Sequence, residues 1–184
     1  MNETENGVLL MDANAIERAI KRIAHEIVEQ NPDLSQVVLA GIPLRGVELT
    51  RRLAFHIGSF EGRTIETGVV DVTMHRDDYH LRGKLPSPQQ TILPLELNNR
   101  TIILIDDVLF TGRTCRAALD TISSFGRPAR IQLATLLDRG HRELPIRPDY
   151  VGKNVPSARN ERVMVRLSNV DPEGDSVWLR KGND

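Results

Sequence analysis

The chain has 184 residues, and 40% of them are hydrophobic, which suits one domain with a substantial buried core. Its 24 basic and 25 acidic residues nearly cancel and aromatic residues make up only 4%, so the composition excludes a chain-wide polyanion-binding surface and a base-stacking sheet. No apolar run approaches the roughly eighteen residues that a membrane span needs, and MNETENG at the start lacks the apolar part of a secretion signal, so we expect a cytoplasmic protein without a membrane partner.

The first part of the chain predicts a helix, a strand and a second helix. Apolar residues recur at helical spacing between 16 and 27, and Asp12 stands where it could cap this helix. Residues 37–40 predict a buried strand, and residues 47–57 again show helical spacing. The loop between them, GIPLRG, has a glycine at each end, and by itself it is more typical of a tight turn than of an anion site.

Residues 66–74 predict the next strand, with Val70 and Val72 as its apolar alternation. The following stretch, 74–99, is polar, contains three prolines and exceeds an ordinary connection in length. Such a segment is typical of an active-site lid or a disordered loop.

The second half continues the alternation. Residues 101–105 and 131–137 predict buried strands, and residues 113–124 predict a helix between them. Strands separated by helices indicate an α/β fold with a mainly parallel central sheet flanked by helices. The short segments after residue 140 are expected to form a separate cap.

The stretch TIILIDDVLFTGRTCRAAL, residues 101–119, places two acids and a Thr/Gly turn between a buried strand and a helix. Such a loop lies at the carboxyl end of the strand, and the free N–H groups of the helix start suit a phosphate. Thr111 and Thr114 add hydroxyl donors, while Gly112 permits close approach. Asp106 and Asp107 would repel a phosphate unless they meet hydroxyls, a metal ion or developing positive charge. A ribose phosphate offers all three, so the pattern predicts a site for a phosphorylated sugar, although two adjacent acids alone are more often turn or capping residues.

This stretch resembles the PRPP-binding signature of the phosphoribosyltransferases. Over nearly its whole length the chain is most similar to the family of bifunctional pyrimidine operon attenuation regulatory proteins/uracil phosphoribosyltransferases. The resemblance implies a type I phosphoribosyltransferase fold as a single domain over 1–184, with a flexible loop at about 74–99 and a small hood mainly at 140–184. The matching segments are RAIKRIAHEIVE (18–29), GIPLRG (41–46), DVTMHRDD (71–78), DVLFTGRT (107–114), DRGHRELPIR (138–147) and YVGKNVP (150–156).

The resemblance also implies a substrate site. The two acids would hold the ribose hydroxyls, the TGRT turn the 5′-phosphate, and the Leu44-Arg45 dipeptide the pyrophosphate, although Pro43 and Leu44 replace a usual polar residue and threonine. Asp106, Asp107 and Arg45 are the catalytic candidates. The implied cofactor is Mg²⁺, with Asp106 and Asp107 as candidate ligands through water. The PRPP- and nucleotide-binding candidates are Leu44, Arg45, Arg76, Asp106, Asp107, Val108, Leu109, Phe110, Thr111, Gly112, Arg113 and Thr114.

For the base, the resemblance implies contacts from Arg139 and from the main chain at Val163; on composition alone these would be a solvent arginine and a strand valine. The implied reaction converts uracil and PRPP to UMP and pyrophosphate without a protein nucleophile, and the lone Cys115 is expected to be a buried filler. A purine transferase of the hypoxanthine-guanine kind, without an RNA role, is the alternative enzyme, although HRELPIR argues against it.

The resemblance further implies a UMP-responsive protein that binds the leader mRNA of the pyrimidine operon. In that reading RNA binding could be the main role and catalysis incidental. It also implies a homodimer or a higher homo-oligomer. Scattered solvated charges are the alternative explanation for the RNA-binding candidates, which are Lys21, His25, Arg142, Arg147 and Lys153.

Overall fold

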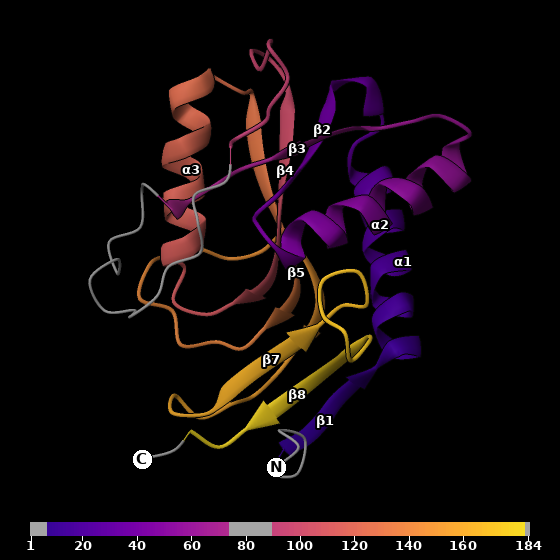
Figure 1. Ribbon diagram of the computed structural model, residues 1–184. Coiled ribbons are helices and arrows are strands. Elements are labelled where there is room, and N and C mark those ends of the chain that lie inside the picture. The colour runs from indigo at the N-terminus through magenta and orange to yellow at the C-terminus, as the bar shows by residue number, and fades with distance from the viewer. Residues whose placement is uncertain (1–6, 74–89, 183–184) are drawn as a thin grey trace.

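The structure is a computed structural model that describes residues 7–73 and 90–182 (Figure 1). Within these ranges strands and helices alternate up to β3, strand β4 follows without a described helix in between, and after α3 the chain continues as strands alone. The elements are β1 (Gly7–Asp12), α1 (Ala13–Gln30), the short 3-10 helix η1 (Leu34–Gln36), β2 (Val37–Gly41), α2 (Arg45–Glu61), β3 (Glu66–Val69), β4 (Thr101–Leu109), α3 (Arg113–Phe125), β5 (Arg130–Asp138), β6 (Tyr150–Asn154), β7 (Arg162–Arg166) and β8 (Ser176–Arg180).

The central sheet has the strand order β3-β2-β4-β5-β6, and all its pairings are parallel. Helices α1 and α2 cover one face and α3 covers the other (Figure 1). Strand β4 shows why both faces are apolar: Ile103 and Ile105 pack toward α1 and α2, while Ile102 and Leu104 pack toward α3. A parallel strand between helix layers must be apolar throughout, as predicted from the sequence.

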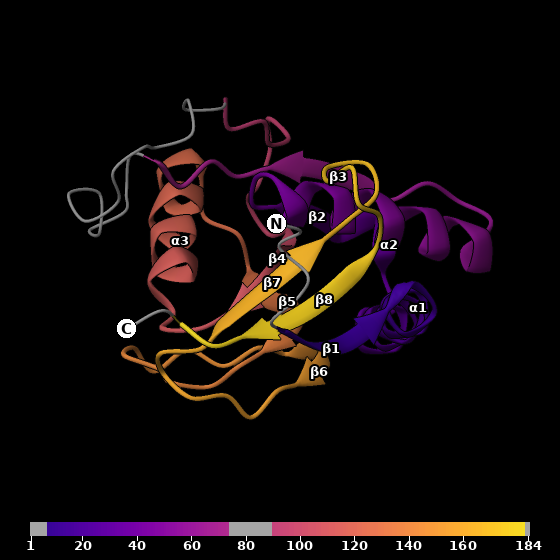
Figure 2. The ribbon, with the colours of Figure 1, turned by 60° about the horizontal axis from the view of Figure 1, so that its bottom comes forward.

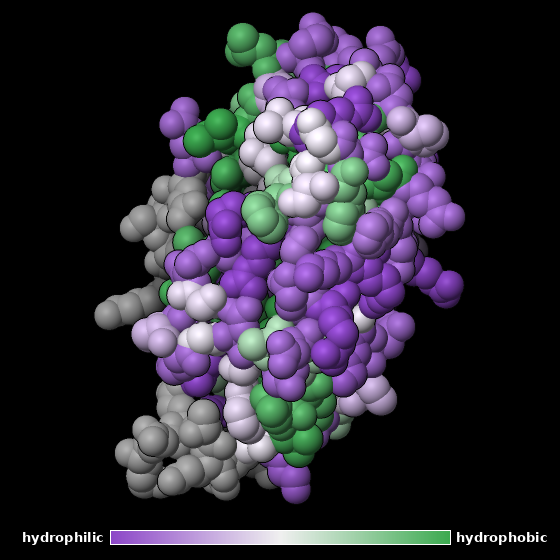
Figure 3. Space-filling model, turned by 90° about the vertical axis from the view of Figure 1, so that its right-hand side faces the viewer, coloured by the Kyte–Doolittle hydropathy of each residue, from purple (hydrophilic) through white to green (hydrophobic). Residues whose placement is uncertain are grey.

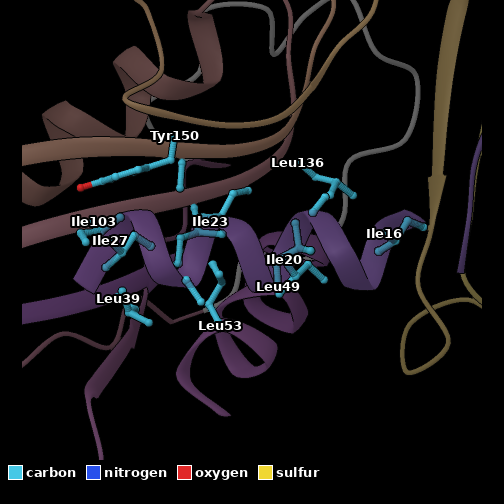
Figure 4. Packing of buried hydrophobic residues seen from close by; sticks show 14 of the residues in the cluster. Ile16, Ile20, Ile23, Ile27, Leu39, Leu49, Leu53, Ile103, Leu136 and Tyr150 are labelled. Carbon is cyan, nitrogen blue, oxygen red and sulfur yellow. The ribbon is translucent and has the colours of Figure 1, made fainter. Parts of the chain in front are cut away.

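Helix α1 confirms the predicted cap and apolar face. Asp12 is the N-cap, and its Oδ1 accepts a hydrogen bond from the Ala15 backbone N–H at 2.7 Å. Isoleucines at helical spacing point from α1 into the core against α2, the sheet and Tyr150 (Figure 4). The buried residues of the helix are Ile16, Ala19, Ile20, Ile23, Ala24 and Ile27.

The strand predicted at 66–74 is shorter than expected, because β3 ends at Val69. Val70 and Val72 are buried beside α3, so their apolar pattern reflects packing and not strand pairing. Val69 pairs instead with Ile92 in an antiparallel bridge, and Leu97 is buried. The described end of the predicted lid, residues 90–99, therefore packs on the body of the protein; residues 74–89 lie outside the described ranges.

The cap differs from the expectation in two respects. Strand β6 pairs with β5 and completes the central sheet, so it is not part of the cap. The N-terminal strand β1 pairs with β8, which gives an antiparallel sheet of order β1-β8-β7 at the carboxyl ends of β4 and β5 (Figures 1 and 2). We call this small sheet with its connecting loops the hood. The sequence does not predict β1, because its partner strand β8 lies at the other end of the chain.

Candidate active site

A cavity of about 540 Å³ lies between the carboxyl end of the central sheet and the hood. Its walls come from the loop after β2, the end of β4, the start of α3, the end of β5 and strand β7. Its position agrees with the rule that open parallel sheets bind ligands beyond their carboxyl ends. The lining residues are Ile42, Pro43, Val72, Asp106, Asp107, Val108, Leu109, Phe110, Thr111, Gly112, Arg113, Thr114, Cys115, Arg139, Glu143 and Val163.

The turn between β4 and α3 forms one wall. Gly112 is the N-cap of α3 with φ +93°, a backbone conformation that side chains other than glycine rarely adopt. Gly112 provides no side-chain cap, and the backbone N–H of Arg113, the first residue of α3, donates to Thr111 Oγ1 at 3.4 Å. With Thr111 and Thr114 in the same lining, this turn has the donors and the helix dipole of an anion site.

Two carboxylates lie at the end of β4 beside this turn. Asp106 Oδ1 accepts from the Asp107 backbone N–H at 2.9 Å, and Asp107 Oδ1 accepts from the Val108 N–H at 2.8 Å, so both side chains are oriented by local backbone. Burial raises the pKa of Asp107, and the positive charge of Arg45 acts in the opposite direction. A partly buried carboxylate of this kind is stabilised by hydroxyl donors or a cation.

The same carboxylates fit a magnesium ion that is held chiefly by its substrate. The described residues contain no group of three or more His, Cys, Asp or Glu side chains arranged to hold a metal. Magnesium commonly uses one or two carboxylates together with waters and substrate phosphates. Asp106 and Asp107 have the donor chemistry and the location for that role.

Arg45 begins α2 and lies close enough to Asp107 for their charges to interact, but neither Arg45 nor Leu44 is among the residues that line the cavity. Its Nε and Nη2 donate to the two oxygens of Asp171 in the hood at 3.0 and 2.6 Å. This bond is the main cause that raises the pKa of Arg45; nearby Asp107 adds to it. Leu44 is half-exposed, and its peptide bond with Pro43 is cis. The predicted pyrophosphate dipeptide thus lies next to the acids, with the arginine fork turned toward the hood.

The same cavity is lined by both predicted base-binding residues. Arg139 is buried, its Nη2 donates to the Ala158 carbonyl at 2.7 Å, and its guanidinium lies 4.2 Å from the centroid of the Phe110 ring. Burial lowers the pKa of Arg139. Val163 in β7 lines the same cavity. The structure therefore brings the predicted residues from Asp106 to Thr114 and both base candidates to one cavity, whereas Leu44 and Arg45 lie outside its lining.

Glu143 is a lining residue that the sequence reading missed. Its carboxylate accepts from Arg113 Nε at 2.8 Å and from Arg159 Nη2 at 2.5 Å, and its backbone N–H donates to the Thr111 carbonyl at 3.0 Å. The only sequence signal was an acid among the basic residues of HRELPIR.

Three RNA-binding candidates lie on α1 and the adjacent strand β6. Lys21 is exposed and pairs with Glu17 at 3.5 Å, and the His25 ring stacks on Phe60 with centroids 3.9 Å apart. Lys153 Nζ donates to the Leu10 carbonyl at 2.7 Å. Arg22 of α1 bonds to backbone carbonyls of β6, which joins the two elements. The face that presents α1 and α2 is largely hydrophilic (Figure 3).

The other two candidates differ from each other. Arg147 is exposed to solvent. Arg142 is partly buried and donates to the carbonyls of Phe110 and Ile146 and to Asp138, at 2.8, 2.9 and 2.5 Å respectively. Arg142 thus holds its own loop against the turn of the cavity, which is a structural task besides any contact with RNA.

Two remaining predictions concern single residues. Arg76 lies outside the described ranges. Cys115 is 4% exposed, and burial raises the pKa of its thiol to about 12, in agreement with the expected filler role.

A turn with the donors of an anion site, two acids before it, an arginine at the neighbouring helix start and a hood over the carboxyl edge of a parallel sheet are the features of a phosphoribosyltransferase. Residues 10–167 match the phosphoribosyl transferase domain family. The chain belongs to this family and, within it, to the bifunctional PyrR proteins. It is 57% identical over 171 residues to the bifunctional protein PyrR of Chloroflexus aurantiacus (93% of this chain, 94% of that protein). It is 51% identical over 174 residues to that of Thermus aquaticus (94% and 96%).

Solved structures agree on the fold. The hypoxanthine phosphoribosyltransferase of Trypanosoma cruzi in complex with the product IMP superposes with a TM-score of 0.74 at 18% identity, covering 98% of each chain. A hypoxanthine-guanine phosphoribosyltransferase from Bacillus anthracis gives 0.72 at 16% identity, covering 96% of this chain and 99% of that one. At such identities the likeness concerns the fold alone. Among the described residues, no helix is both long and apolar enough to cross a membrane.

Proposed function

We propose that the protein transfers ribose 5-phosphate from PRPP to N1 of uracil, giving UMP and pyrophosphate, and that it also binds the leader mRNA of the pyrimidine operon as a UMP-responsive attenuator. The observation that carries the enzymatic part is one cavity lined by the two acids, by the turn from Thr111 to Thr114, and by Arg139 and Val163. Such a cavity suits a ligand with a phosphorylated ribose at one end and a small base at the other.

The proposed reaction needs positioning and charge more than covalent chemistry. As pyrophosphate departs, positive charge develops on the ribose, and the carboxylates of Asp106 and Asp107 lie where they could stabilise it. The turn at Thr111 to Thr114 holds the 5′-phosphate, and Arg45 binds the leaving pyrophosphate. Magnesium, held by substrate phosphates and the two aspartates, would supply further charge neutralisation for the leaving group.

The base is the point on which the alternative enzyme differs. A hypoxanthine-guanine transferase would use the same sugar-phosphate wall, so the discriminating test is purified protein with PRPP, Mg²⁺ and a panel of uracil, cytosine, hypoxanthine, guanine and adenine. Uracil-dependent release of pyrophosphate, with little from purines, is expected. Turnover with hypoxanthine and none with uracil would contradict the uracil assignment.

The regulatory part is supported by membership of the bifunctional PyrR proteins and by exposed basic groups on α1, β6 and the loop before β6. In this proposal Lys21, His25, Arg147 and Lys153 contact RNA phosphates and exposed bases, and the protein acts in the cytoplasm as a homodimer or higher homo-oligomer. Binding of leader RNA, compared with an unrelated hairpin at physiological salt, tests it. Equal affinity for both RNAs would contradict it.

A further inference from the structure

The arginine assigned to pyrophosphate already has a bidentate anionic partner within the chain. Arg45 and Asp171 are 126 residues apart, yet two hydrogen bonds of 3.0 and 2.6 Å join the guanidinium to the carboxylate. The Arg45 side chain is 36% exposed and that of Asp171 is 15% exposed. An arginine fork binds carboxylate and phosphate through the same parallel N–H groups, so the two anions compete for one set of donors.

Asp171 is fixed in place by the hood loop between β7 and β8. Its Oδ2 also accepts from the Leu167 backbone N–H at 2.9 Å, and its own N–H donates to the Leu167 carbonyl at 2.7 Å. The loop is further tied to α2, because Asn169 donates to the buried Glu48 at 2.9 Å. The carboxylate of Asp171 is therefore held in position by the hydrogen bonds of its loop.

A second aspartate of the same loop repeats this arrangement with a different arginine. Asp175 accepts from the Ser168 backbone N–H at 2.8 Å and pairs with Arg52 of α2. Arg52 lies about two turns along α2 from Arg45, and neither arginine is among the residues that line the cavity. The two ion pairs join the same loop to the same helix, but of the two arginines only Arg45 acts on the cavity carboxylate Asp107; the charged partners of Arg52 are Asp175 and Glu48.

We propose that Asp171 is a positioning residue. Its carboxylate binds the guanidinium of Arg45 in the ligand-free enzyme and is replaced there by the pyrophosphate group of the substrate or product. This inference rests on the proposed function. When PRPP binds, its pyrophosphate displaces the carboxylate from Arg45; when pyrophosphate leaves, the carboxylate takes the fork back. Asp171 thus weakens pyrophosphate binding and favours product release, and it keeps Arg45 from being left without an anion between turnovers.

The test measures magnesium pyrophosphate binding directly, by calorimetry, as well as catalysis. Asp171→Asn removes the charge at nearly unchanged size, and it should tighten pyrophosphate binding and lower the KM for PRPP by about two- to fivefold, the range of partly exposed ion pairs. The KM for uracil should not change. Asp171→Glu, which keeps a carboxylate, should remain close to the wild type.

Two controls separate this role from a structural one. Asp175→Asn breaks the equivalent ion pair to Arg52 and should lower the melting temperature without tightening pyrophosphate binding. In an Arg45→Ala background, Asp171→Asn should have no further effect on pyrophosphate affinity, because the competition acts through Arg45. If Asp171→Asn does not fold, Asp171→Ser, which also removes the charge, takes its place.

Unchanged or weaker pyrophosphate binding in the charge-removing variant overturns the proposal, as does equal tightening in Asp175→Asn. Failure of the proposed function is a separate result, since it would appear as absent uracil transfer by the wild type, whereas the calorimetric comparison requires no turnover.

Discussion

At the residue scale, Asp106 and Asp107 are the groups on which transfer should depend most. Replacing both by asparagine keeps their size and their hydrogen-bond acceptors for the Asp107 and Val108 amides but removes the charge from the proposed ribose site. We expect kcat to fall at least about a hundredfold, comparable with the loss of a preorganised electrostatic group elsewhere. Steady-state assays with saturating PRPP measure this.

The matched control is Asp120→Asn, which removes an exposed acid of α3 that pairs with Arg116. It should leave turnover unchanged, and circular dichroism should show that both proteins fold. Near-normal turnover in the double variant would mean that the charges of Asp106 and Asp107 do not contribute to the reaction.

The phosphate turn permits a second residue-scale prediction. Thr111→Val removes a hydroxyl from the cavity lining and should raise the KM for PRPP more than the KM for uracil. Gly112→Val should do the same and also destabilise the fold by about 1–3 kcal/mol, because valine would be forced to φ +93°. Initial-rate measurements and thermal melts separate the two effects; equal changes in both Michaelis constants would contradict the assignment of this turn to phosphate.

Glu48 supplies a pH-dependent prediction about stability. Hydrogen bonds from Arg51, then from Arg52 and Asn169, lower the pKa of Glu48 from 4.5 to about 2, and its side chain is only 6% exposed. Because the folded-state pKa lies below the unfolded value, the stabilisation is complete above about pH 4.5 and is lost as the pH falls toward 2. Glu48→Gln should lower the free energy of unfolding at pH 7 by up to about 3 kcal/mol. Between pH 4.5 and 2, the free energy of unfolding of the variant should fall less steeply than that of the wild type. Denaturant titrations between pH 2 and 7 test this; an unchanged slope would refute it.

At the element scale, the sequence predicts those elements whose pattern lies within one segment. Apolar residues at helical spacing predict α1, and a continuous apolar run predicts β4 as a strand that is buried on both faces. The roles of β1 and β6 did not, because β1 pairs with β8 at the far end of the chain and β6 joins the sheet beside β5. Short strands have no periodicity that specifies their partner, so no single segment contained this information.

The same distinction holds for the site. The motif from Asp106 to Thr114 is contiguous, so the sequence could predict a phosphate and ribose site directly. Glu143 meets Arg113 across 30 residues, and Asp171 meets Arg45 across 126, so their contacts depend on the tertiary fold. The acid within HRELPIR is the only sequence signal for Glu143, and it does not identify Arg113 as the partner; the pairing of Asp171 with Arg45 has no local signal at all.

The loop from Arg139 to Arg147 is the element that connects the active site with the proposed RNA surface. Arg142→Ala should impair both uracil transfer and RNA binding, because Arg142 holds the loop that carries Arg147 against the Phe110 carbonyl at the cavity. Arg147→Ala, on an exposed residue of the same loop, should weaken RNA binding and lower its salt dependence but leave transfer intact. Parallel RNA titrations and transfer assays compare them. Equal loss of uracil transfer in both variants would contradict the assignment of Arg147 to RNA binding alone.

At the scale of the whole molecule, the proposed enzyme and the proposed regulator share one ligand, UMP. Its phosphate would lie in the turn at Thr111, whose carbonyl accepts from the Glu143 and Leu144 backbone N–H groups at 3.0 and 3.2 Å. If the turn moves when the nucleotide binds, these two hydrogen bonds would move the loop that carries Arg147 with it. This contact gives a physical route by which UMP could change RNA affinity without a large rearrangement.

Linkage makes that coupling measurable from both ends. If UMP raises the affinity for leader RNA by some factor, saturating RNA must raise the affinity for UMP by the same factor, which for typical coupling is about 5- to 150-fold. RNA titrations with and without UMP, and UMP titrations with and without RNA, should therefore give equal ratios. An unrelated hairpin should give a ratio near one in both experiments. If UMP leaves leader-RNA affinity unchanged, the turn and the loop are not coupled, and the nucleotide serves the enzyme alone.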